Sequence, residues 1–192
     1  MAQASSNPLI TVSLWFNWSD LSYIERSPSK LKAIASILNI FTTQLIKYVI
    51  NDAQDSPFPN YDKVTAEHVV PAITSLIEQL YKEIDDLEEN VKPTWPGLVE
   101  PLERIVDRLG RAWGTVSHLK AVKDSEDLRK AVEQVQPEKV KLTLRLSQSK
   151  PLYEAFRAIR DGPLWSSFTE AQQRIVEGEL RDFVLGGVAL EG

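Results

Sequence analysis

The sequence predicts an all-α protein whose antiparallel helices form an open layer rather than a closed bundle. Between residues 65 and 188, apolar side chains recur at alternating spacings of four and three, which places them along one side of a helix. Short links at residues 91–94 and 123–125 join successive helices, so neighbouring helices should run antiparallel. Serine or threonine precedes several of the periodic stretches, where its hydroxyl can cap a free backbone N–H.

Composition excludes several classes of site. The 192 residues are 43% hydrophobic and 26% charged, which is ordinary for a globular protein of one domain with or without an appendage. A net charge of -5 gives no electrostatic reason to expect a nucleic-acid partner. The sequence has no cysteine, which excludes disulfides, thiolate metal sites and cysteine nucleophiles. It also contains no Gly-rich phosphate loop and no Gly-x-Ser-x-Gly motif.

Residues 1–56 differ from the rest and form an N-terminal appendage. The first basic residue is Arg26, so neither a secretory signal nor an Arg-rich transit peptide is predicted. We therefore expect a cytoplasmic location, with chloroplast or mitochondrion as the alternative. Residues 31–50 predict one helix, amphipathic or partly buried, because their uncharged run is shorter than the ~20 residues of a membrane span. A helix on the membrane surface is less favoured, since only three lysines could anchor it.

Residues 57–192 predict one helical domain. After a proline-rich lead-in, Thr65 can cap a short turn that includes His68, and Pro71 is expected to interrupt that turn. A longer helix then runs to about residue 90, with apolar residues at 73, 77, 80, 84, 87 and 91. Its acidic face is expected to be solvated. The face consists of Glu78, Glu83, Asp85, Asp86, Glu88 and Glu89. A metal site built from these carboxylates is the disfavoured alternative, because nothing gives the side chains a shared inward geometry.

Residues 93–122 predict the helix around which the others pack. Thr94 is the expected N-cap, and Pro96 follows early in the helix, where its missing donor costs little. Pro101 lies deeper and is expected to kink the helix. The apolar stripe needs cover from neighbouring helices and consists of Trp95, Val99, Leu102, Val106, Leu109, Trp113 and Val116.

Three further helices are predicted downstream. Ser125 caps the first, which Pro137 should kink. Its apolar side continues through Val140, Leu142, Leu144 and Leu146, whose two-residue spacing keeps a strand as an alternative. Pro151 starts the second, which ends at residues 161–163, and Thr169 begins a capping-box pattern before the third. The buried set of the third helix is predicted to be Ile175, Val176, Leu180, Phe183, Val184 and Val188.

Several blocks of sequence occur in an order known from one enzyme family. Residues 112–122 read Ala-Trp-Gly-Thr-Val-Ser-His-Leu-Lys-Ala-Val, and residues 148–153 read Gln-Ser-Lys-Pro-Leu-Tyr. Further blocks are residues 58–61, 67–73, 93–95, 98–102, 127–129 and 187–190. From about residue 58 to 191 the chain resembles the N-terminal helical region of oligopeptidase A-like zinc peptidases, the thimet oligopeptidase group. Residues 136–141 are similar to plant members.

The resemblance implies a metalloendopeptidase family that degrades short peptides, yet it assigns no catalytic, cofactor-binding or metal-binding residue to this chain. Members are much longer and use His-Glu-x-x-His, whose histidines bind zinc and whose glutamate is the general base. His68 is followed by Val-Val and His118 by Leu-Lys, so neither begins that motif. We expect His68 at a helix terminus or in packing, and His118 to be hydrogen-bonded and partly buried.

The resemblance also implies how such a region acts. In the family it packs against the catalytic half and walls a channel that admits short peptides. We therefore expect this chain to be the N-terminal part of an oligopeptidase, inactive alone and without a cofactor of its own. Its expected partner is the catalytic half or a full-length relative. Such a domain should leave an apolar face exposed. A non-catalytic helical fragment that binds peptides or proteins is the alternative. We expect no membrane span.

Residues 11–53 interrupt the similarity. Residues 5–10 resemble the start of plant members, in which they lead almost directly into a stretch like residues 54–59. We interpret the intervening segment as a retained intron or a mispredicted exon. A second such event would explain an end at residue 192, in the middle of the family's domain.

Overall fold

The computed structural model describes residues 61–188, all of which belong to one compact unit. The described residues form five α-helices and contain no strand, which confirms the predicted all-α class. The appendage at residues 1–56, the helix expected at residues 31–50 and the segment at residues 11–53 lie outside the described residues.

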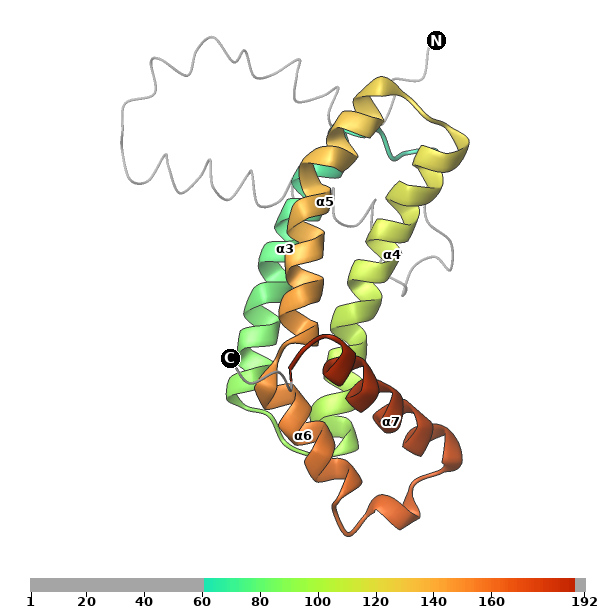
Figure 1. Cartoon of the computed structure of the whole chain (residues 1–192). Helices are drawn as coiled ribbons and strands as arrows, with labels where there is room; N and C mark the ends of the chain where they lie inside the picture. Colours follow the sequence, from blue (N-terminus) through green and yellow to red (C-terminus); the bar gives the residue numbers. More distant parts are fainter. Residues whose placement is uncertain (1–60, 189–192) are drawn as a thin grey trace, which may run out of the picture. The chain divides into compact units, whose positions relative to one another are not determined.

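The first three helices form one layer: α3 (Ala66–Glu89), α4 (Glu100–Val122) and α5 (Glu126–Ser147). α4 runs antiparallel to the other two, and α3 and α5 run in the same direction (Figure 1). α3 packs along α5 and also against α4, whereas α4 and α5 touch each other little (Figure 1). The short links at residues 91–94 and 123–125 reverse the chain as predicted. The arrangement is therefore open, as the sequence indicated.

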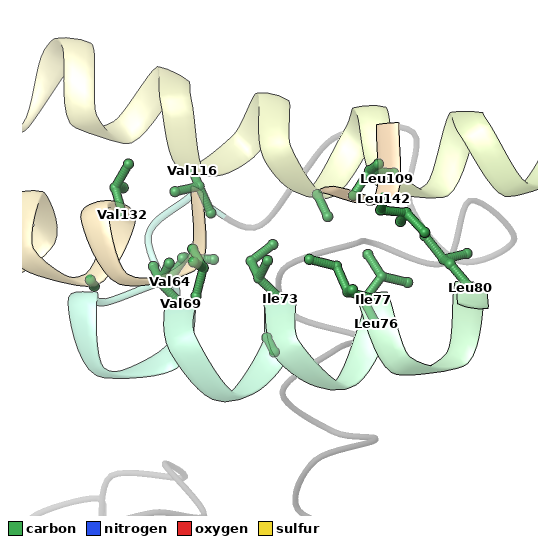
Figure 2. Packing of buried hydrophobic residues seen from close by; sticks show 14 of the residues in the cluster. Val64, Val69, Ile73, Leu76, Ile77, Leu80, Leu109, Val116, Val132 and Leu142 are labelled. Carbon is green, nitrogen blue, oxygen red and sulfur yellow. The ribbon is translucent and has the colours of Figure 1, made fainter. Parts of the chain in front are cut away.

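A single apolar cluster holds this layer together. From α3, Ile73, Leu76 and Leu80 are fully buried, and they meet Val116 of α4 and Leu142 of α5 (Figure 2). Each such side chain, fully buried, stabilises the fold by about 1.5–3 kcal/mol relative to leaving it exposed. The spacing predicted for α3 is confirmed, with Leu76 as an additional member.

α3 is one continuous helix, so the break predicted at Pro71 is wrong. Pro71 lies inside α3 on its exposed side. A proline there loses one backbone hydrogen bond and crowds the preceding turn. Val69 and Ile73, buried on either side of it, anchor both parts of the helix in the same core, and this packing offsets the loss.

A π-helical turn, η2 (Trp95–Val99), immediately precedes α4. The Thr94 hydroxyl accepts a hydrogen bond from the Gly97 backbone N–H at 3.2 Å, which confirms the predicted N-cap. The Glu100 N–H bonds to the Trp95 carbonyl across the wide π turn. Pro101 therefore falls in the first turn of α4, where its missing donor costs little.

The buried face of α4 overlaps the predicted one, because Val99, Leu102, Leu109 and Val116 are buried as predicted, but it is shifted to one side. Val106 is 50% exposed, while Ile105 and Ala112 are buried. Trp113 is half-buried, and the Lys139 ammonium lies 5.7 Å from its ring centroid. The stripe observed from the π turn through α4 consists of Leu98, Val99, Leu102, Ile105, Leu109, Ala112, Val116 and Leu119.

α5 is also continuous, and the strand alternative for residues 140–146 is wrong. Ser125 accepts a hydrogen bond from the Leu128 N–H at 3.2 Å, as predicted for the N-cap. A helix turns about 100° per residue, so residues two apart point to nearly opposite sides. Leu142 is therefore buried, while Val140 and Leu144 are exposed, contrary to prediction.

A helical hairpin completes the described fold: α6 (Lys150–Arg160), the short η3 (Trp165–Ser167) and α7 (Glu170–Leu185). Thr169 and Gln172 form the predicted capping box, with bonds of 3.0 and 3.3 Å. Ile175 and Val184 are exposed, contrary to prediction. A second cluster joins the hairpin to η2 and the start of α4 and contains Leu98, Val99, Leu102, Leu152, Ala155, Phe156, Ile159, Val176, Leu180 and Phe183.

α7 ends in a left-handed glycine. Gly187 has a φ of 92°, and the Val188 N–H bonds back to the Phe183 carbonyl at 3.1 Å. The Gly187 N–H bonds to the Val184 carbonyl, which completes a Schellman motif. The backbone of another helix approaches closely at Gly186, where an added Cβ would lie 2.7 Å from the Ser147 carbonyl oxygen.

Candidate functional site

The two histidines lie in different settings. His68 is buried in the first turn of α3, where its Nδ1 accepts a hydrogen bond from the Thr65 backbone N–H at 3.2 Å. Its Nε2 is buried and has no hydrogen-bond partner among residues 61–188. His118 is exposed on α4, with its ring centroid 5.0 Å from that of Tyr61. The helix-terminus role of His68 is thus confirmed, and the partial burial predicted for His118 is wrong.

Arg145 of α5 is bound by two carboxylates of α3. Its guanidinium donates to both oxygens of Glu88, each at 2.8 Å, and to Asp85 at 2.5 Å. The buried Ser149 hydroxyl donates to Glu88 at 2.6 Å. Burial opposes ionisation of Glu88, but the hydrogen bonds from Arg145 and Ser149 outweigh it and hold the pKa of Glu88 below its ordinary 4.5.

A second pair joins α4 to α3, since Arg108 donates to both oxygens of Glu83 at 2.6 and 2.8 Å. Part of the acidic face that sequence reasoning left to solvent therefore ties the layer together. Arg145 and Glu88 are 57 residues apart in the chain, and Arg108 and Glu83 are 25 apart. No local spacing signals such pairs.

The described residues do not fit a zinc site. In the part of the chain that the structure describes, no group of three or more His, Cys, Asp or Glu side chains could hold a metal ion. His68 already uses Nδ1 at the start of α3, and the carboxylates of Glu83 and Glu88 are bound by arginines.

Among the described helices, none combines the length and the apolar character that a membrane crossing requires.

An apolar groove of about 300 Å³ lies between α4 and α7. The buried side chains Val99, Leu102 and Phe156 line it. Val106 of α4 and Ile175 of α7 also line it, and they are 50% and 46% exposed. Both were predicted to be buried. An exposed apolar surface was expected, but its place became visible only with the register of these two helices.

The same groove is acidic at its edges. Glu103 and Asp107 of α4 and Glu179 of α7 line it, and Asp107 pairs with Arg111. Glu179 is half-buried, and within residues 61–188 it has no ion-pair partner. Burial, reinforced by the nearby charge of Asp182, raises the pKa of Glu179 above its ordinary value.

Comparison with known families identifies the domain. The family model described as Neurolysin/Thimet oligopeptidase, N-terminal domain, matches residues 73–192, which is more than half of the chain. The chain belongs to this family. This confirms the resemblance found in the sequence blocks.

The chain is similar to oligopeptidases from plants and bacteria. It is 58% identical over 138 residues to the organellar oligopeptidase A, chloroplastic/mitochondrial, of Arabidopsis thaliana. The aligned region makes up 72% of this chain and 17% of that relative. It is 56% identical over 138 residues to the probable cytosolic oligopeptidase A of the same plant, and the aligned region makes up 72% of this chain and 20% of that relative. For oligopeptidase A of Escherichia coli (strain K12), the identity is 38% over 138 residues, and the aligned region makes up 70% of this chain and 20% of that relative. The chain thus spans about a fifth of the length of these relatives.

Proposed function

We propose that residues 57–192 serve as the N-terminal helical domain of an oligopeptidase A-like zinc metalloendopeptidase that degrades short peptides. The observation that carries this proposal is the 58% identity over 138 residues to the organellar oligopeptidase A. The layer of α3, α4 and α5, held by one core and by interhelical arginine pairs, supports a scaffold role. In this role the domain forms a wall of the channel that admits the peptide.

The chemistry is proposed to lie outside these 192 residues. Zinc bound by His-Glu-x-x-His activates water in such enzymes, and neither histidine of this chain begins that motif. The chain alone is therefore proposed to be inactive. Its own residues position helices and exclude water from the domain interior, and none is assigned a proton-transfer step.

A chimera tests the proposal. The matching region of the probable cytosolic oligopeptidase A of Arabidopsis thaliana is replaced by that of this chain, and hydrolysis of a fluorogenic short peptide is measured with and without a chelator. We expect chelator-sensitive hydrolysis to persist. Leu142→Asp in the chimera should abolish it by disrupting the core, whereas Leu144→Asp, at an exposed site on the same helix, should not. A folded, zinc-loaded chimera without activity would contradict the proposal.

A non-catalytic binding fragment is the second candidate, favoured by the exposed apolar groove between α4 and α7. The two candidates differ in what the partner must be. A scaffold domain needs the rest of an oligopeptidase, whereas a binding fragment would capture short peptides by itself. Equilibrium dialysis of short peptides against the purified chain separates them, because a scaffold domain should retain none.

We further propose that residues 1–56 are separate from the domain and that residues 11–53 derive from an intron or a mispredicted exon. Transcript reads that join the flanking sequences directly would support this, and spliced reads that retain the segment would oppose it. We propose a cytosolic location, although the two plant relatives carry different compartments in their names. A fluorescent fusion of the full chain tests it, and signal confined to an organelle would contradict it.

A further inference from the structure

We propose that the groove between α4 and α7 is a docking site for a basic amphipathic helix from the part of an oligopeptidase A chain that lies outside this N-terminal domain. The inference rests on the proposed function, and it specifies one surface, one kind of partner and the charge that the partner must carry.

The shape of the groove fits a helix. Val106 of α4 and Ile175 of α7 line the groove, each about half exposed, together with the buried Leu102 and Phe156. An amphipathic helix that presents aliphatic side chains at spacings of three and four can fill such a groove. Filling it would remove Val106 and Ile175 from water and extend the second core.

The charges of the groove select a basic partner. Elsewhere at the interhelical contacts of the described fold, the carboxylates of Glu83 and Glu88 meet an arginine from another helix. Glu179 is half-buried and Glu103 is exposed in the groove, and residues 61–188 supply no ion-pair partner to either. A lysine or arginine on the docking helix would supply the missing positive charge.

The length of the relatives points to the source of this helix. The chain spans 17% to 20% of the Arabidopsis and Escherichia coli relatives, so most of each relative lies outside this domain. The family match runs through α7, which packs on α6 with one side and lines the groove with another. A wall of the groove is thus formed by the last helix that the structure describes.

A second copy of this chain is a poorer fit. Among the described residues, Val140 and Leu144 of α5 form another exposed aliphatic pair. The cations beside it are already used, because Lys141 pairs with Glu138 and Arg145 with Glu88. Two copies, each with a net charge of -5, would also repel one another.

Binding of peptides to the full 192-residue chain tests the proposal. Overlapping peptides, each long enough for several helical turns, cover the part of the organellar oligopeptidase A of Arabidopsis thaliana outside its match to this chain. Fluorescence anisotropy measures their affinities. We expect a peptide with an aliphatic stripe flanked by lysine or arginine to bind, with an affinity that falls as salt is added.

Matched variants locate the site. Val106→Glu and Ile175→Glu should each weaken binding by about tenfold or more, because they place a charge in the apolar groove. Val122→Glu on α4 and Val184→Glu on α7 are the controls, since both change an exposed valine that does not line this groove. They should leave the affinity within about twofold. Circular dichroism verifies that all four variants fold.

Three outcomes would overturn the proposal: no peptide binds, the peptide that binds is acidic, or the control variants weaken binding as much as the groove variants. Self-association of the chain in sedimentation that Val106→Glu abolishes would assign the groove to a second copy and also overturn it. In the chimera, Val106→Glu should lower the melting temperature more than Val122→Glu, and equal effects would count against docking. Because chimera activity is measured without the overlapping peptides, an active chimera with no binding of those peptides would reject the docking site alone.

Discussion

Replacing Arg145 with methionine measures how strongly polar contacts hold α5 to α3. Methionine keeps an unbranched apolar stem but removes the guanidinium that donates to Glu88 and Asp85. Glu88 then keeps its bond from Ser149 and loses its only charged partner among the described ion pairs. The folded state must hold an uncompensated and largely enclosed carboxylate.

The exposure of the two side chains sets the size of the effect. Arg145 is 32% exposed and Glu88 is 17% exposed. Exposed ion pairs contribute about 0–1 kcal/mol, whereas removal of one partner from a fully buried pair costs about 3–5 kcal/mol. This pair lies between the two limits, so Arg145→Met should lower the free energy of unfolding by about 1–3 kcal/mol.

Urea denaturation followed by circular dichroism gives this free energy. Arg104→Met is the matched control, because Arg104 pairs with Glu100 at 3.9 Å with both side chains exposed to solvent. It should change stability by less than about 0.5 kcal/mol. Equal effects of the two substitutions, or no effect of Arg145→Met, would refute the reasoning.

The same pair should respond to acid. Because the folded state holds the pKa of Glu88 below 4.5, ionised Glu88 contributes stability that is fully present above that value. This stability is lost as the pH falls through the lowered folded pKa. The stability difference between the wild-type chain and Glu88→Gln should therefore shrink in acid, and a difference that grows would have the wrong sign.

Three further substitutions, each with a matched control, probe the fold. Leu142→Ala should cost about 2–5 kcal/mol by urea denaturation, and the exposed Leu144→Ala less than about 0.5 kcal/mol; similar losses would contradict the helical register of α5. His68→Ala should cost about 1 kcal/mol in thermal melts, whereas His68→Gln, which can still accept from the first-turn N–H, should cost less. Gly187→Ala should lower stability by about 1 kcal/mol, because Gly187 has a φ of 92°. Gly110→Ala should raise stability by about 0.5–1 kcal/mol, because Gly110 lies in α4 with open space around it. Scanning fluorimetry should show melting temperatures that shift in opposite directions, and shifts in the same direction would contradict this prediction.

Local features of the fold could be predicted from the sequence because their causes are local. Thr94, Ser125 and Thr169 cap helices through groups three residues ahead, so a short window of sequence contains all the information. The fold class followed from the period of apolar residues, which the buried side of α3 reproduces.

The exact buried faces and the continuity of α3 through Pro71 could not be predicted in the same way. A spacing of four and three fits two starting points one residue apart, and only the neighbouring helices decide between them. This is why Val106 is exposed and Ile105 is buried. Pro71 and Pro137 remain inside helices because buried residues on both sides hold the helix in place.

The groove and the interhelical pairs depend on tertiary structure. Glu88 meets Arg145 only because α3 and α5 lie side by side (Figure 1). Glu179 lies in the groove because α7 folds back toward the start of α4 through α6 and η2. Residues 83 to 89 alone indicated only a polar face, since the sequence does not state which helices are neighbours.

The central claim is that this chain is a helical scaffold domain whose zinc chemistry is supplied by other residues. The most direct test is zinc analysis of the purified 192-residue chain together with peptide hydrolysis in the presence and absence of a chelator. The account predicts less than stoichiometric zinc and no chelator-sensitive hydrolysis. One zinc ion per chain with hydrolysis that the chelator abolishes would contradict it.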